Sequence, residues 1–148
     1  MSSAARTGVL TKVGLAIAIA ALLAVAYAVA AGGSAAAAQS TCRGANATIV
    51  GTSGPDEIEG TAGRDVIVAK GGADDVEGRG GNDLICAGGG NDEAEGDAGN
   101  DRIFGGRGND ELEGKSGRDV LNGGRGFDEG EGGLGVDTCV RVERAQSC

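Results

Sequence analysis

Ten positions spaced nine residues apart between residues 51 and 140 mostly hold large aliphatic residues, a spacing that neither a helix nor a strand produces by itself. Each stands in the middle of a three-residue segment that can form a short strand. Because side chains alternate along a strand, the central residue faces one side and its two neighbours face the other. We expect the central residues to face inward: Ile58, Ile67, Val76, Ile85, Ala94, Ile103, Leu112, Leu121, Gly130 and Cys139.

The neighbours of these central residues follow a longer period of 18 residues. In alternate units they are acidic, as in Glu57/Glu59 and Glu93/Glu95, and in the other units they are largely apolar, as in Val66/Val68 and Leu84/Cys86. Two strands and two turns therefore make one coil, and about five coils fit. The pattern predicts an all-β fold: a parallel β-roll, or two-sheet β-solenoid, with one sheet acidic outside and the other largely apolar outside.

The six residues before each strand segment carry glycine and aspartate at fixed places. Glycine permits the positive φ angles and close chain approach of a tight turn, so these residues are predicted to be loops. The fourth position is glycine in all ten units, and the sixth is always aspartate: Asp56, Asp65, Asp74, Asp83, Asp92, Asp101, Asp110, Asp119, Asp128 and Asp137.

Stacking the coils brings these carboxylates together on two edges of the roll. Strands stack about 4.8 Å apart, and two charges at that distance repel by about 1 kcal/mol in water and roughly 3 kcal/mol at an intermediate dielectric. Calcium would remove this conflict, because it accepts six to eight oxygens from carboxylates and carbonyls, whereas magnesium demands tighter octahedral geometry. Five loops per edge leave four gaps, so up to about eight Ca²⁺ ions are predicted. The alternative is a metal-free solenoid that uses Gly and Asp only as turn residues; asparagine never replaces the aspartate, which disfavours it.

The unit resembles the RTX, or hemolysin-type, calcium-binding nonapeptide G-G-x-G-x-D-x-U-x, where U is a large aliphatic residue. The resemblance covers about 90 residues and implies a right-handed roll. It also implies that loop carbonyls and the aspartates of adjacent turns supply the calcium ligands. Carried over to this chain, the metal ligands are the ten aspartates together with carbonyls near Gly54, Gly63, Gly72, Gly81, Gly90, Gly99, Gly108 and Gly117. The sites from Asp74 to Asp110 follow the pattern best.

Residues 1–38 have the order of a secretory signal peptide. Arg6 and Lys12 precede an apolar run over residues 13–31, and the alanines at 35–38 offer a cleavage site. An uncleaved membrane anchor is the alternative, since this run is just long enough to span a bilayer. Cleavage would leave a secreted chain without a membrane segment. Its 11 basic and 22 acidic residues give a net charge of −11, which disfavours nucleic acid as a partner.

All four cysteines lie beyond the predicted cleavage site, and an even count outside the cell favours disulfides. A Cys42–Cys86 bridge is preferred, because residues 39–48 would then cover the apolar outer face; a homodimer or a cell-surface partner is the rival occupant of that face. A Cys139–Cys148 bridge is also preferred, because it would fold residues 141–148 over the end of the roll as a cap.

No catalytic constellation is present: the chain has no histidine and no serine in a nucleophile-elbow context. The predicted organisation is a signal peptide (1–38), a lead-in (39–48), the β-roll (49–140) and a C-terminal cap (141–148). The leading hypothesis is a secreted, non-enzymatic calcium-binding protein in which binding is coupled to folding. The alternative is a cell-surface or matrix adhesin or scaffold that calcium stiffens.

Overall fold

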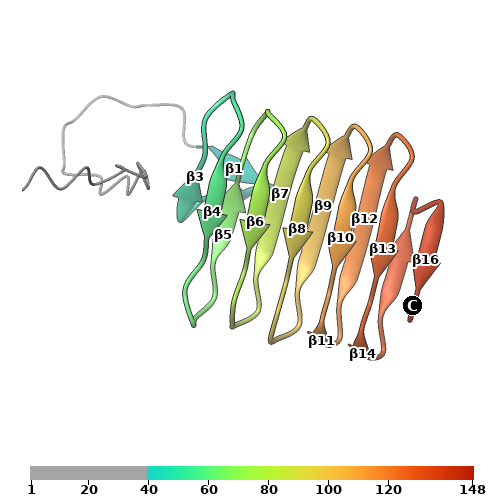
Figure 1. Cartoon of the computed structure of the whole chain (residues 1–148). Coiled ribbons are helices and arrows are strands. Elements are labelled where there is room, and N and C mark those ends of the chain that lie inside the picture. The colour runs from blue at the N-terminus through green and yellow to red at the C-terminus, as the bar shows by residue number, and fades with distance from the viewer. Residues whose placement is uncertain (1–39) are drawn as a thin grey trace, which may run out of the picture.

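The computed structural model describes residues 40–148, which form two parallel six-stranded sheets wound as one solenoid (Figure 1). One sheet, here the acidic sheet, consists of β4 (Glu57–Glu59), β6 (Asp75–Glu77), β8 (Glu93–Glu95), β10 (Glu111–Glu113), β13 (Glu129–Glu131) and β16 (Arg144–Gln146). The other, here the apolar sheet, consists of β3 (Ile49–Val50), β5 (Val66–Val68), β7 (Leu84–Gly89), β9 (Arg102–Arg107), β12 (Val120–Arg125) and β15 (Thr138–Val140).

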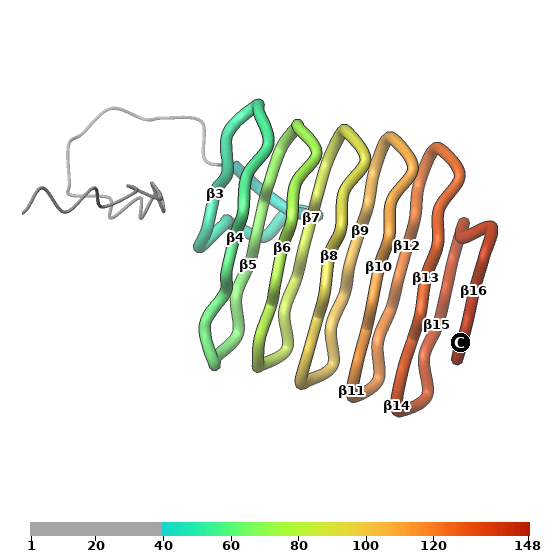
Figure 2. The backbone as a smooth tube through the Cα atoms, in the orientation of Figure 1, coloured from blue at the N-terminus to red at the C-terminus, as the bar shows by residue number. Residues whose placement is uncertain are grey.

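Strands alternate between the two sheets along the chain, so each circuit adds one strand to each sheet (Figure 2). Residues 18 apart are directly paired, for example Ile58 with Val76 and Ile67 with Ile85. The predicted β-solenoid of about five 18-residue coils is therefore confirmed.

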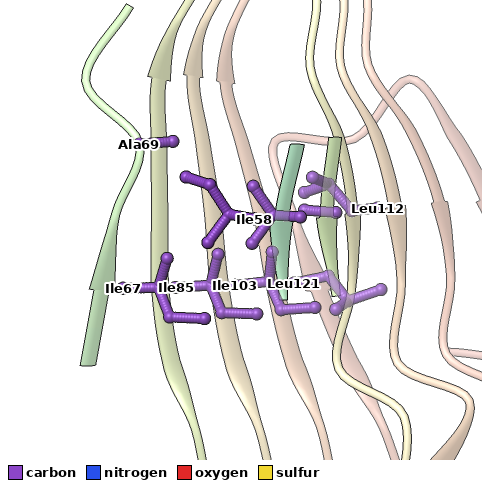
Figure 3. Close-up of a cluster of buried hydrophobic side chains, with 9 residues drawn as sticks. Ile58, Ile67, Ala69, Ile85, Ile103, Leu112 and Leu121 are labelled. Carbon is purple, nitrogen blue, oxygen red and sulfur yellow. The ribbon is translucent and has the colours of Figure 1, made fainter. Parts of the chain in front are cut away.

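The core is a narrow double row of aliphatic side chains between the sheets (Figure 3). Ile67, Ile85, Ile103 and Leu121 of the apolar sheet are fully buried, and so are Val76, Ala94 and Leu112 of the acidic sheet. The prediction that the central residues face inward is confirmed. A core this thin buries few large side chains, so hydrophobic burial contributes only modestly to the stability of the roll.

The loops are more regular than the sequence predicts. On the edge that leads into the acidic sheet, three apolar-sheet strands continue three residues further than expected, and Gly88, Gly106 and Gly124 pair with one another. On the opposite edge, β11 (Ser116–Gly117) pairs with β14 (Leu134–Gly135). The prediction of six-residue loops was therefore wrong for these coils: with little or no side chain in the way, their backbones approach closely enough to hydrogen-bond.

A short hairpin of β1 (Thr41–Cys42) and β2 (Ala45–Asn46) packs on the outer face of the apolar sheet. The predicted Cys42–Cys86 disulfide anchors it, with a Cα–Cα distance of 5.7 Å. Cys42 is fully buried, and the hairpin buries Val66 and Leu84 beneath it. The expectation that the lead-in covers this face is confirmed for its N-terminal part.

The second predicted disulfide, Cys139–Cys148, is also present. It ties the tail to the middle residue of β15, while β16 extends the acidic sheet by pairing with β13. The side chain of Val142 lies over Gly130, whose missing side chain leaves space in the last layer of the core.

We predict that the Cys42→Ser/Cys86→Ser double variant loses about 4 kcal/mol of unfolding free energy, because this bridge closes a 44-residue loop of the unfolded chain. The Cys139→Ser/Cys148→Ser variant should lose less, about 3 kcal/mol, since its loop spans only 9 residues. Urea denaturation of both variants checks the order. Equal losses would show that loop closure does not set the contribution of either bridge.

The predicted signal peptide lies outside the described residues. Within residues 40–148 there is no helix of the length and apolar character needed to cross a membrane.

Candidate metal sites between the coils

The aspartates form two columns, one on each edge of the roll, directly before the strands. The first edge carries Asp56, Asp74, Asp92, Asp110 and Asp128, and the second edge carries Asp65, Asp83, Asp101, Asp119 and Asp137. All are buried except Asp56 and Asp137, which are half-buried at the two ends. A buried ionised carboxylate is costly unless its oxygens have partners, so the partners decide what the columns can do.

One oxygen of each carboxylate joins neighbouring coils. The amide N–H of Asp83 donates to Oδ1 of Asp101 at 2.8 Å, and the amide of Asp101 donates to Oδ1 of Asp119 at 2.8 Å. Together with these two, the two columns contain eight such amide-to-Oδ1 hydrogen bonds, at 2.8–3.1 Å. The structure thus brings together every predicted aspartate with its neighbour one coil away.

The second carboxylate oxygen has no hydrogen-bond donor within the described part of the chain in eight of the ten aspartates. These buried Oδ2 atoms belong to Asp74, Asp83, Asp92, Asp101, Asp110, Asp119, Asp128 and Asp137. The first coil differs, because Oδ2 of Asp56 accepts from the Thr52 amide at 2.6 Å and Oδ2 of Asp65 accepts from the Thr61 amide at 2.7 Å. A buried anionic oxygen without a donor matches the ligand chemistry of a hard cation.

The first-position glycines leave room for oxygens from two coils to meet. A Cβ placed on Gly78 would have three oxygens as its nearest neighbours outside the adjoining residues: the Gly96 carbonyl at 2.8 Å, Asp83 Oδ2 at 2.9 Å and the Glu95 carbonyl at 3.3 Å. The space at this point is therefore surrounded by carboxylate and carbonyl oxygens, which are the donors that calcium prefers.

The fourth-position glycines hold the stacked loops in close contact. A Cβ on Gly90 would overlap the carbonyl oxygen of Gly72, and one on Gly99 would overlap that of Gly81; both glycines have positive φ, 140° and 149°. The carbonyls predicted as ligands therefore lie between successive loops. Those of Gly72, Gly81, Gly90, Gly99 and Gly108 accept none of the loop backbone hydrogen bonds formed by residues 40–148.

An asparagine ladder that the sequence analysis missed runs beside each aspartate column. Oδ1 of Asn82 accepts from the amide of Asn100 at 2.8 Å, and Oδ1 of Asn91 accepts from the amide of Asn109 at 2.9 Å. In these bonds the later coil donates and the earlier coil accepts, whereas in the aspartate bonds the earlier coil donates. Successive middle coils are therefore joined by hydrogen bonds in both directions. The signal was present in the sequence, since four consecutive units have asparagine before the aspartate.

Burial raises the pKa of Asp101 and Asp110 to about 6, against an ordinary value of 3.8. The amide hydrogen bond to Oδ1 opposes this shift, and the carboxylates in the coils above and below add to it. Burial also raises the pKa of Asp74, Asp83, Asp92, Asp119 and Asp128. At neutral pH these aspartates are therefore ionised although they are buried, and a bound cation would lower the free-energy cost of keeping their charges there.

These pKa values predict how the metal-free roll responds to acid. A carboxyl whose pKa is higher in the folded state binds its proton more tightly there, so the metal-free roll loses stability as pH rises from about 4 to about 6. We expect chelator-treated protein to gain β-structure by circular dichroism between pH 7.5 and pH 5. A metal-free spectrum that does not change over this range would contradict the prediction.

The outer face of the acidic sheet carries two further rows of carboxylates, which are solvated. Lys115 forms ion pairs with both Glu95 and Glu113, and Arg79 pairs with Glu59. These exposed pairs contribute little to stability. The outer rows differ from the buried columns, because none of their described carboxylate oxygens is buried without a hydrogen-bond partner.

A two-sheet solenoid whose stacked loops direct buried carboxylate and carbonyl oxygens into common spaces belongs to the class of metal-binding β-rolls. The family model of the RTX calcium-binding nonapeptide repeat, which represents four copies, matches residues 50–85, 59–94, 77–112, 87–121, 95–129 and 106–139. These matches together span residues 50–139, more than half of the chain. The chain therefore belongs to the RTX calcium-binding nonapeptide repeat family, and it is a calcium-binding repeat protein. No curated protein matches it significantly.

Proposed function

We propose that this chain is a secreted, non-enzymatic protein whose roll folds when Ca²⁺ fills the gaps between stacked loops. The observation that carries the proposal is the set of eight buried Oδ2 atoms without a hydrogen-bond donor among the described residues. The ligands are the ten predicted aspartates with the fourth-position glycine carbonyls from Gly54 to Gly117. Up to about eight ions would be held between the repeat loops.

Coupling of binding to folding follows from the weakness of the metal-free roll. Its core is one double row of aliphatic side chains, its loops are rich in glycine, which loses much conformational entropy on folding, and its buried carboxylates repel. Calcium supplies the positive charge that offsets this repulsion. Since calcium binds the folded state, stability rises with calcium concentration.

Secretion is supported by the disulfides and by the predicted signal peptide. Two disulfides are typical of an oxidising compartment. Extracellular calcium, near the millimolar level, suits modules of moderate affinity. The chain would then remain loose before export and fold outside the cell.

A homodimer or a cell-surface partner on the apolar outer face stays a prediction. The β1–β2 hairpin covers Val66 and Leu84, while Val140, further along the same sheet, is 40% exposed. A partner would therefore bind beyond the hairpin, toward the C-terminal coils.

A calcium titration tests the proposal. Circular dichroism of the purified protein is expected to change from a largely unordered spectrum in chelator to a β spectrum in millimolar calcium, with a much smaller change in equimolar magnesium. A β spectrum that is already complete in chelator and does not change with calcium would overturn the coupling of binding to folding.

A further inference from the structure

The repeat ends before the chain does, and the tail takes a shorter path. An aspartate one full coil after Asp128 would stand at position 146, but that residue is Gln146. The tail instead crosses from β15 to β16 through three residues, Arg141 to Glu143, and pairs with β13 at an offset of 15 residues.

Glu143 takes the place of the missing aspartate. The amide N–H of Asp128 donates to Oε2 of Glu143 at 2.7 Å, as the amide of Asp110 donates to Oδ1 of Asp128 at 3.0 Å one coil earlier. The extra methylene of glutamate lets a carboxylate reach this position despite the shorter loop. The bond that joins aspartates throughout the column thus continues into the tail.

The remaining donors of an interlayer site are also present at this junction. The Asp128 side chain is fully buried, and its Oδ2 has no hydrogen-bond partner among residues 40–148. This Oδ2 and the carbonyl oxygen of Arg141 both lie in contact distance of the position that a Cβ on Gly123 would occupy. Asp83 Oδ2 and the Gly96 carbonyl meet in the same way inside the roll.

The nearby cation does not neutralise this junction. The guanidinium of Arg144 lies 3.6 Å from Glu129, on the outer face of the acidic sheet, and over the Phe127 ring at 5.6 Å. Among residues 40–148, neither Asp128 nor the exposed Glu143 forms an ion pair with Lys or Arg, so a bound cation would offset the charge of the buried Asp128.

We propose that Asp128, Glu143 and the carbonyl oxygen of Arg141 form an additional calcium site between the last repeat loop and the C-terminal tail. The site rests on the proposed function, because it extends the first-edge column by one gap beyond those of the nonapeptides. Binding there holds the tail against β13, while the Cys139–Cys148 bridge keeps the tail close, so the same ion that completes the column also seals the end of the roll.

Counting bound ions in two matched variants tests the site. Glu143→Gln keeps an oxygen that can accept the Asp128 amide but removes the charge, and Glu131→Gln makes the same change on the exposed face of β13. By native mass spectrometry and calorimetric titration, Glu143→Gln is expected to bind one calcium ion fewer than the wild-type chain, and Glu131→Gln the same number. Glu143→Asp keeps the charge but shortens the side chain by one methylene, so it should also bind one ion fewer. This variant replaces Glu143→Gln in the test if the glutamine variant does not fold.

The outcomes separate this inference from the proposed function. If Glu143→Gln binds as many ions as the wild-type chain, the tail site is wrong although the repeat sites stand. If the wild-type chain binds no calcium, the proposed function itself is wrong, and the tail site with it.

Discussion

Gly99→Ala is expected to prevent calcium-induced folding of the middle coils. The new Cβ would overlap the Gly81 carbonyl oxygen, and the φ of 149° is one that L side chains rarely adopt. Strain and overpacking together should cost about 4 kcal/mol or more. That is a large share of the stability of a domain of this size.

Gly54→Ala is the matched control, because Gly54 has the same position in the first loop. No coil precedes it, its φ is not in the left-handed region, and among the described atoms nothing lies within 4 Å of the added Cβ. Calcium titrations by circular dichroism should show Gly54→Ala close to the wild-type chain and Gly99→Ala without a transition. If the two variants behaved alike, the close stacking of the loops would not be what demands glycine.

Asp101→Asn is expected to change stability in opposite directions with and without calcium. In chelator the variant should be more stable by roughly 1–3 kcal/mol at pH 7, because it removes a buried charge whose pKa is raised to about 6. In calcium it loses a ligand, and the midpoint of folding should move to about tenfold higher calcium or more, equivalent to about 1.4 kcal/mol.

Asp75→Asn serves as the control for this prediction, since Asp75 is exposed on the acidic sheet and its side chain faces solvent. Circular dichroism measures both effects, as the fraction of β structure in chelator and as the calcium concentration at the midpoint of folding. A calcium midpoint equal to that of the wild-type chain would show that the Asp101 carboxylate has no role in metal binding.

Strict periodicity made the architecture predictable. Nine-residue spacing placed Ile67 and Ile85 in the core, and the 18-residue alternation of acidic and apolar neighbours separated the two sheets. The preference for the Cys42–Cys86 pairing used the same register, since Cys86 faces outward beside Leu84, within reach of the lead-in that carries Cys42. Each repeated position has one environment, so one correct register places every residue of that type.

Features that depend on departures from the repeat could not be predicted in this way. Thr52 and Thr61 donate hydrogen bonds to Oδ2 of the first two carboxylates, whereas the later units have other residues at this position and leave Oδ2 without a donor among the described residues. Glu143 reaches Asp128 only because the tail shortens its last turn, which the nonapeptide pattern does not encode. The extended strands β7, β9 and β12 arise from contact between backbones, to which side-chain pattern is a poor guide.

A crystal structure of the protein grown in millimolar calcium, with anomalous diffraction used to locate the ions, would show directly whether calcium binds between the coils. We expect anomalous peaks between stacked loops on both edges, each about 2.3–2.6 Å from an aspartate Oδ2 and from loop carbonyl oxygens. A well-ordered roll in which Oδ2 of Asp83, Asp101 and Asp110 contacted no ion under these conditions would contradict this expectation.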